Sequence, residues 1–152
     1  MNNYMRLLGE KILKEKDAIA KKLHKDRMLG RSGLDRLQSG KLEVNAVQLC
    51  AEFIELFGEA FLKHENKNEI MDKIGKWCKE TGEYFFQYGI PLDEAIKNAG
   101  YYREYIWKEL EETMMEQEMK ASEVMKVVYL IDPLLDHAIH SFSMASVKFH
   151  QL

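Results

Sequence analysis

Apolar residues recur at every third or fourth position along most of the chain, and no stretch alternates apolar with polar residues. This spacing places apolar side chains on one face of an α-helix, whereas alternation is typical of a β-strand. The second expected helix shows the pattern most clearly, with an apolar face formed by Val47, Cys50, Phe53, Ile54, Phe57 and Phe61. The pattern predicts an all-α fold, and a length of 152 residues predicts a single domain over residues 1–152.

Breaks in the helical period predict where each helix begins and ends. We expect helices over residues 3–25, 43–64, 69–88, 91–118 and 122–149. Gly89 suits the left-handed residue that ends a helix, and Pro91 suits the first turn of the next. Ser122 is the expected N-cap of the last helix. Pro133 lies inside that helix and should kink it or mark an N-terminal break.

Charge and hydropathy exclude several classes of protein. The 22 basic and 25 acidic residues give a net charge of −3, which argues against a nucleic-acid-binding protein. No run of apolar residues reaches membrane-spanning length, and the N-terminus lacks the features of a secretory signal, so we expect a cytoplasmic protein without a membrane span. In such a compartment, Cys50 and Cys78 are expected to be buried free thiols rather than a disulfide.

The sequence shows no catalytic constellation. It contains no G-x-S-x-G hydrolase motif and no Glu-x-x-His pair of the di-iron type, so we expect no enzyme. His137 and His140, with Asp132 and Asp136 nearby, could bind a metal, but a polar helix face is the simpler interpretation and we expect no metal site. Residues 65–136 contain no histidine to ligate haem from the helix before the last long pair, so no haem is expected.

Arg103 interrupts an apolar stripe on the fourth expected helix. Its neighbours at three- and four-residue steps are Ile96, Gly100, Trp107 and Leu110. A buried guanidinium is costly without an anion, and Gly100 leaves room beside it. Arg103 is therefore predicted to bind the carboxylate of an apolar ligand in bidentate fashion. The alternative is an arginine that reaches outward to solvent or pairs with a distant Glu.

Aromatic residues on three helices could form the remainder of a pocket. The candidates are Phe53, Phe57, Trp77, Phe85, Tyr88 and Trp107. Such stripes more simply form a core, but an apolar tunnel with one charged mouth also fits a fatty acid. Burial of each methylene contributes about 0.8 kcal/mol to binding.

The last two helices carry more apolar surface than one partner helix covers. The residues are Met114, Met115, Met119, Val124, Val127, Val128, Ile131, Leu134 and Leu135. A symmetric four-helix interface between two copies would bury this surface, so we expect a homodimer. The alternative is a long core hairpin in a monomer.

Two stretches carry a family resemblance: GEYFFQYGIPLDEAIKNAGYYREYIWKEL and YLIDPLLDHAIHSFSMASVKFH. They resemble the non-haem globin sensor domains of Bacillus, which include the N-terminal domains of stressosome RsbR-type proteins. Within this family, the chain is most similar to sporulation-inhibitory proteins carried on anthrax virulence plasmids. Those proteins are similar in turn to the sensor domain of a sporulation sensor histidine kinase.

The resemblance implies a globin-like fold without haem that dimerises through its last two helices. It also implies a fatty acid in an apolar tunnel, with its carboxyl group on an arginine and a chloride ion. Arg103 matches that arginine, and Arg31 and Arg36 are the alternatives. His137 would favour the anion if it were protonated and nearby.

The same resemblance implies signal transduction without an output domain, since the sequence ends at Leu152. Two hypotheses for sporulation inhibition follow. The chain either withholds the fatty-acid signal from the kinase or forms mixed dimers with the kinase's sensor domain, which would need no ligand.

Overall fold

The computed structural model describes residues 3–29, 40–87 and 92–151, and within these ranges the chain is all-helical, with no strand. The elements are α1 (Asn3–Leu29), α2 (Gly40–Leu62), the short 3-10 helix η2 (His64–Asn66), α3 (Lys67–Gln87), α4 (Leu92–Glu116) and α5 (Ala121–Gln151). The predicted all-α class is confirmed for these residues.

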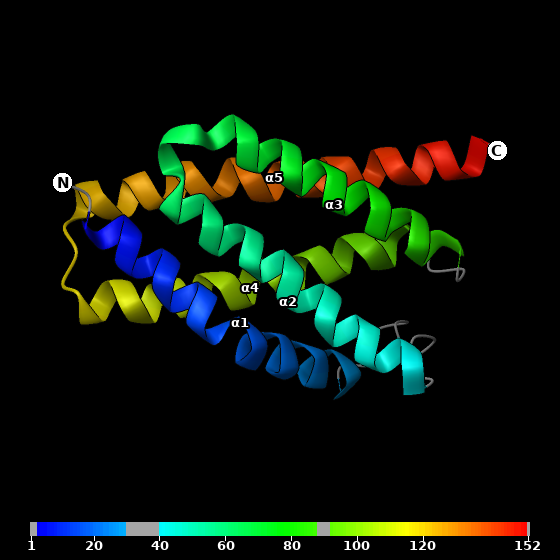
Figure 1. Cartoon of the computed structure of the whole chain (residues 1–152), viewed down its shortest axis with the longest axis horizontal. Coiled ribbons are helices and arrows are strands. Elements are labelled where there is room, and N and C mark those ends of the chain that lie inside the picture. The colour runs from blue at the N-terminus through cyan, green and yellow to red at the C-terminus, as the bar shows by residue number, and fades with distance from the viewer. Residues whose placement is uncertain (1–2, 30–39, 88–91, 152) are drawn as a thin grey trace.

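The five α-helices pack in two crossing groups (Figure 1). α3 lies along α5, and α1 packs extensively against α2 on the other side of the molecule. α4 contacts both α5 and α1, and so joins the two groups. Although α2 and α3 are consecutive, they contact each other much less than α1 contacts α2. Their limited contact leaves room for the groove described below.

Large side chains fill the space between the helices. Those with almost no exposed surface include Phe53, Phe57, Phe61, Tyr102 and Phe142. Full burial of one such apolar side chain contributes about 1.5–3 kcal/mol relative to leaving it exposed. The expected apolar face of α2 is buried except at Val47, which is partly buried, so the period there correctly identified the core.

Two glycines allow α1 and α2 to approach closely. A Cβ atom placed on Gly9 would lie 2.9 Å from both the carbonyl oxygen of Gly58 and the Cβ of Phe61. These atoms belong to the backbone or are fixed to it, so they cannot move aside as a flexible side chain would. A side chain at position 9 would therefore force the two helices apart.

The α4–α5 connection is closed by a helix-ending turn at Glu118. Its φ of 50° is left-handed, a conformation usually taken by glycine. The backbone N–H of Met119 donates to the carbonyl of Met114 (3.2 Å), and that of Glu118 donates to Met115 (3.1 Å). This pair of bonds is the Schellman pattern, and it ends α4 at Glu116 rather than at the expected Glu118.

The expected cap of α5 is wrong by two residues. The helix begins at Ala121, and the backbone N–H of Lys120 donates to the Glu123 carboxylate at 2.9 Å. A carboxylate three residues into a helix that accepts the N-cap N–H is half of a capping box. Lys120, rather than Ser122, therefore occupies the capping position.

Pro133 lies within a continuous α5, so the predicted N-terminal break is wrong. Proline has no N–H to donate to the carbonyl four residues earlier, which is that of Tyr129. The ammonium of Lys67, at the start of α3, donates to this carbonyl oxygen at 3.3 Å. A side chain from another helix thus replaces the hydrogen bond that proline removes.

α1 ends at Leu29 rather than at residue 25, since Arg27, Met28 and Leu29 are good helix formers. The expected boundary at Gly89 and Pro91 lies outside the described residues.

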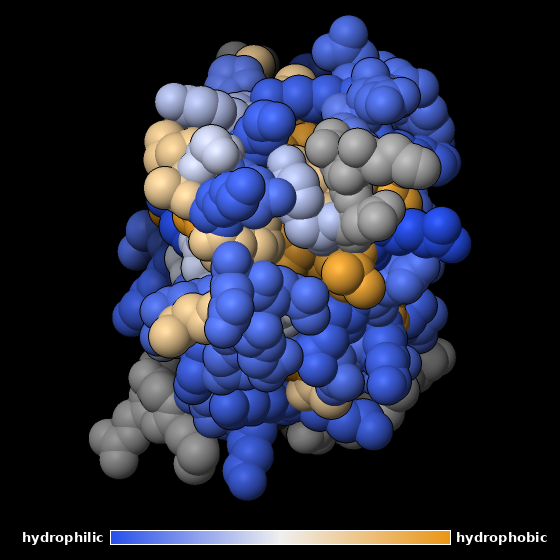
Figure 2. All heavy atoms as spheres, turned by 90° about the vertical axis from the view of Figure 1, so that its left-hand side faces the viewer, coloured by the Kyte–Doolittle hydropathy of each residue, from blue (hydrophilic) through white to orange (hydrophobic). Residues whose placement is uncertain are grey.

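Figure 2 shows the end of the molecule where α2 turns into α3 and α4 connects to α5. Hydrophilic residues cover most of this end, with small hydrophobic patches between them. Within the described ranges, no helix combines the length and apolar character needed to cross a membrane.

Candidate functional site

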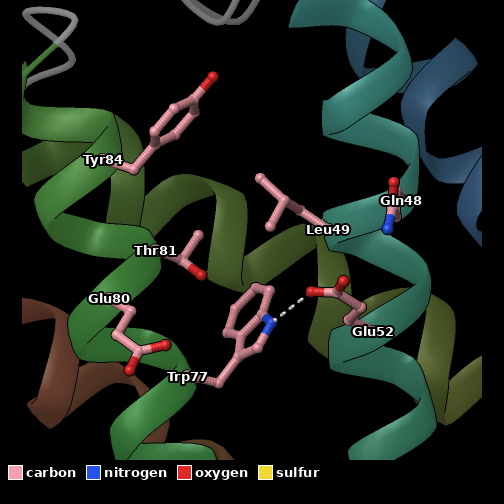
Figure 3. Close-up of a pocket in the computed structure, with 7 residues that line it drawn as sticks. All are labelled: Gln48, Leu49, Glu52, Trp77, Glu80, Thr81 and Tyr84. Atoms are coloured by element: carbon pink, nitrogen blue, oxygen red, sulfur yellow. Dashed lines mark hydrogen bonds between the residues drawn. The ribbon is translucent and has the colours of Figure 1, made fainter.

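An open groove of about 340 Å³ lies where α2 and α3 diverge (Figure 3). Its lining residues are Gln48, Leu49 and Glu52 from α2 and Trp77, Glu80, Thr81 and Tyr84 from α3. Leu49 and Trp77 point into the space between the two helices, and Thr81 and Tyr84 follow along α3. The volume falls at the lower end of the range of about 300–1,000 Å³ for small-molecule pockets.

Trp77 is held in place on both its polar and its apolar side. Its indole Nε1 donates to the Glu52 carboxylate at 3.1 Å, which ties α3 to α2 across the groove. Its ring packs against Phe53, with centroids 4.9 Å apart, and meets Phe142 edge-on at 6.3 Å. A partly buried indole fixed in this way offers a preformed apolar surface to a ligand.

Behind Trp77, an aromatic cluster runs into the core. Phe53 is its centre, with ring centroids 5.1 Å from Phe57 and 4.6 Å from Tyr102. The Tyr102 hydroxyl donates to the Cys50 sulfur at 2.9 Å, so this polar group is satisfied in the core. The structure therefore brings together three predicted pocket residues, Phe53, Phe57 and Trp77, of which Trp77 alone lines the groove.

A second hollow of about 310 Å³ continues the groove along the same two helices and shares Glu52, Trp77 and Glu80 with it. Its further lining residues are Glu55, Leu56, Glu59, Lys73 and Lys76. The polar rim of the combined groove is therefore mainly acidic, and its two lysines both lie in the second hollow, beside Glu55 and Glu59.

The two lysines of the second hollow differ in their partners. The ammonium of Lys73 lies 3.4 Å from Glu59 and 3.7 Å from Glu69, and the Glu59 carboxylate is the main cause of the raised pKa of Lys73. Lys76 takes part in none of the ion pairs among the described residues. Among the lining residues that the structure describes, Lys76 is thus the cation without an ion pair.

Arg103 lies on α4 and is not among the lining residues of either hollow. Its Nη2 donates to the Asp136 carboxylate of α5 at 3.1 Å, and 43% of its side chain is exposed. The expectation of an inward-facing guanidinium is therefore wrong, because an acid on the next helix draws it to the surface. Its Nε is buried and has no hydrogen-bond partner among the described residues. A ligand role for Arg103 stays a prediction.

The other predicted site residues are dispersed. Phe85 is buried in the core, and Trp107 is partly buried on α4 away from the groove. His137 faces a separate hollow between α3 and α5. Tyr88, Arg31 and Arg36 lie outside the described residues.

Sequence reasoning missed Leu49, Thr81 and Tyr84 as groove residues, and Tyr102 as part of the aromatic cluster. For Tyr102 a signal was present, since it begins a four-residue repeat with Ile106 and Leu110 on α4, and all three are buried.

Within the described part of the chain, no group of three or more His, Cys, Asp or Glu side chains is placed to hold a metal ion. Comparisons of the chain with protein-family models, with curated proteins and with solved structures found no match.

Proposed function

We propose that the chain is a globin-like, non-haem sensor domain that binds a fatty acid in the groove between α2 and α3. The observation that carries this proposal is the fixed indole of Trp77, which lines a partly apolar groove of ligand size. Leu49 and Tyr84 extend the apolar surface on either side of it. An acyl chain laid along these residues would be removed from water over much of its length.

The acidic rim restricts where the carboxylate of a fatty acid can lie. Glu52 and Glu80 would repel it, and the Trp77 N–H is already donated to Glu52. Lys76, which makes no ion pair among the described residues, is the anchor that we assign to the carboxylate, and it must outweigh Glu55 and Glu59 at the same end of the groove. Arg103, with or without a chloride ion, is the competing anchor, and a ligand there would have to displace Asp136.

The first test is mass spectrometry of organic extracts of the natively purified protein, which should contain a fatty acid. Its affinity is then measured by quenching of Trp77 fluorescence in a Trp107→Phe background, where Trp77 is the single tryptophan. Each methylene contributes about 0.8 kcal/mol, so affinity should rise about fourfold per methylene until the acyl chain fills the groove.

Two leucine variants provide a matched pair for this assay. Leu49→Asp places a charge in the groove and should abolish binding, whereas Leu7→Asp changes an exposed leucine of α1 and should leave binding unchanged. Lys76→Met and Arg103→Met then identify the anchor of the carboxylate. Absence of any extracted lipid, together with equal binding by Leu49→Asp and the parent protein, would refute the proposal.

The resemblance to the sporulation-inhibitory proteins supplies the biological setting. In this proposal the chain inhibits sporulation by taking up the fatty acid that activates a sensor histidine kinase. Inhibition should therefore require an intact groove, and Leu49→Asp should lose it in a sporulating host.

We propose mixed-dimer formation as the second candidate, because exposed apolar side chains concentrate on α4 and α5. Of the eight large apolar side chains that are exposed among the described residues, six lie there: Ile96, Met115, Met125, Tyr129, Met144 and Val147. Scattered apolar residues are ordinary on a surface, but a set gathered on two adjacent helices is typical of an interface. A second copy, or the sensor domain of the kinase, would cover it.

Co-expression with the kinase's sensor domain tests this candidate. A mixed dimer should be captured with the parent chain and lost when Tyr129→Glu and Met125→Glu are combined, while Leu7→Glu serves as the exposed control on α1. Inhibition that persists in the Leu49→Asp variant but disappears in the Tyr129 and Met125 variant would favour mixed dimers over ligand uptake.

A further inference from the structure

We propose that the hollow between α3 and α5 binds a phosphate-bearing small molecule. This hollow has a volume of about 250 Å³ and lies on the α5 side of α3; of its lining residues, Lys76 is shared with the combined groove between α2 and α3. Its polar lining consists of Asp72, Lys76 and Lys79 from α3 and His137, His140, Ser141 and Lys148 from α5.

The electrostatics of the hollow favour an anion. Three lysines and one aspartate give 3 − 1 = +2, with the histidines counted as neutral. None of the ion pairs among the described residues involves Lys76, Lys79 or Lys148. These charges are therefore not neutralised within the described chain, although its sequence is acidic as a whole. Excess positive charge in a concave surface concentrates anions from solution.

Hydrogen-bonding groups converge at the floor of the hollow because position 75 is glycine. A Cβ atom on Gly75 would lie 2.8 Å from Nε2 of His137 and 3.5 Å from Oγ of Ser141. The absence of this atom lets the imidazole and the hydroxyl lie directly against α3. They are one helical turn apart on α5, so both face the same small volume.

Phosphate is the anion that this arrangement suits best. Lysine ammoniums, an imidazole and a hydroxyl can donate to several oxygens of one tetrahedral group, and charge-assisted bonds of this kind are the strong ones. A single carboxylate or a chloride ion would use fewer of these donors. The volume lies below the usual range for drug-sized ligands, so it suits phosphate with at most a small organic group.

Thermal shift and calorimetric titration with inorganic phosphate, sulfate and glycerol 3-phosphate test the site, with sodium chloride at equal ionic strength as the reference. Phosphate and sulfate should raise the Tm more than chloride does. A stronger effect of glycerol 3-phosphate than of phosphate identifies an organic phosphate as the ligand, and the reverse identifies the free ion.

Combining Lys79→Met with Lys148→Met should weaken phosphate binding about tenfold, which corresponds to the loss of one charge-assisted hydrogen bond. Lys21→Met removes an exposed lysine from α1 and should leave binding unchanged. Gly75→Ala keeps every charge but displaces His137, and should also weaken binding.

Equal Tm shifts for chloride and phosphate would overturn the proposal, as would equal phosphate affinity in the parent, the double lysine variant and Gly75→Ala. The test substitutes Lys79, Lys148 and Gly75, none of which lines the groove between α2 and α3, so it succeeds or fails separately from the fatty-acid proposal.

Discussion

The close approach of α1 and α2 at Gly9 leads to a quantitative prediction, for which Gly100 on α4 is the control. Both glycines lie inside helices, where replacing glycine by alanine contributes about 0.8–1 kcal/mol of stability through helix propensity. A Cβ on Gly100 meets no atom within 4 Å. Gly100→Ala should therefore stabilise the protein by about 1 kcal/mol.

At Gly9 the same gain is opposed by packing. The new methyl group would lie 2.9 Å from the Gly58 carbonyl oxygen, and the helices would have to separate to admit it. Overpacking of this kind costs about 1–3 kcal/mol. Because the propensity gain is common to both variants, the difference in unfolding free energy between Gly9→Ala and Gly100→Ala should equal the packing cost, about 1–3 kcal/mol.

Urea denaturation of the two variants and the parent, monitored by circular dichroism, measures this difference. In thermal unfolding, Gly100→Ala should raise the Tm by about 2–4 °C. If Gly9→Ala stabilised the protein as much as Gly100→Ala, the close contact between α1 and α2 would be refuted.

Three further predictions follow from local features. Glu118→Gly should raise the free energy of unfolding, measured in urea, by about 1 kcal/mol, because a left-handed conformation costs a non-glycine residue about 1–2 kcal/mol. An unchanged midpoint of urea unfolding would show that the backbone at position 118 is not strained. Burial is the largest cause of the raised pKa of the Glu109 carboxyl, and repulsion from Glu112 adds to it. The folded protein therefore holds the carboxyl proton of Glu109 more tightly than the unfolded chain does. As a result, the contribution of Glu109 to stability falls as the pH rises above the pKa of Glu109 in the unfolded chain. Glu109→Gln should therefore raise the Tm at pH 7 but change it less near pH 4, and an equal effect at both values would contradict this reasoning. Burial also raises the pKa of the Cys78 thiol, and the Cys50 side chain is equally buried. Neither thiol should therefore react with a thiol reagent until the protein unfolds. Rapid modification of either cysteine in the native state would contradict the described core.

The sequence was sufficient to predict the helices because burial on one face of a helix leaves a periodic signal. This worked best for α2, where Cys50, Phe53 and Phe57 are all buried as expected. It failed at Ile96, which fits the apolar stripe expected around Arg103 but is 38% exposed.

The candidate site was harder to predict because its geometry depends on contacts between helices. Arg103 fits an apolar stripe, but its partner Asp136 lies 33 residues away on α5, and no spacing within α4 reveals it. The sequence predicts Trp77 as a pocket candidate, but the groove that it lines exists because α2 and α3 diverge, and no pattern within either helix reveals this. The hollow at His137 likewise depends on Gly75, whose role is visible once α3 and α5 are placed side by side.

The bond from Lys67 to the Tyr129 carbonyl couples two parts of the molecule mechanically. Pro133 makes this turn the weakest point of α5, and its repair comes from the first residue of α3, one wall of the Trp77 groove. Because this bond joins the start of α3 to α5, a movement of α3 relative to α5 would have to break it and leave the Tyr129 carbonyl without the donor that replaces the missing proline N–H.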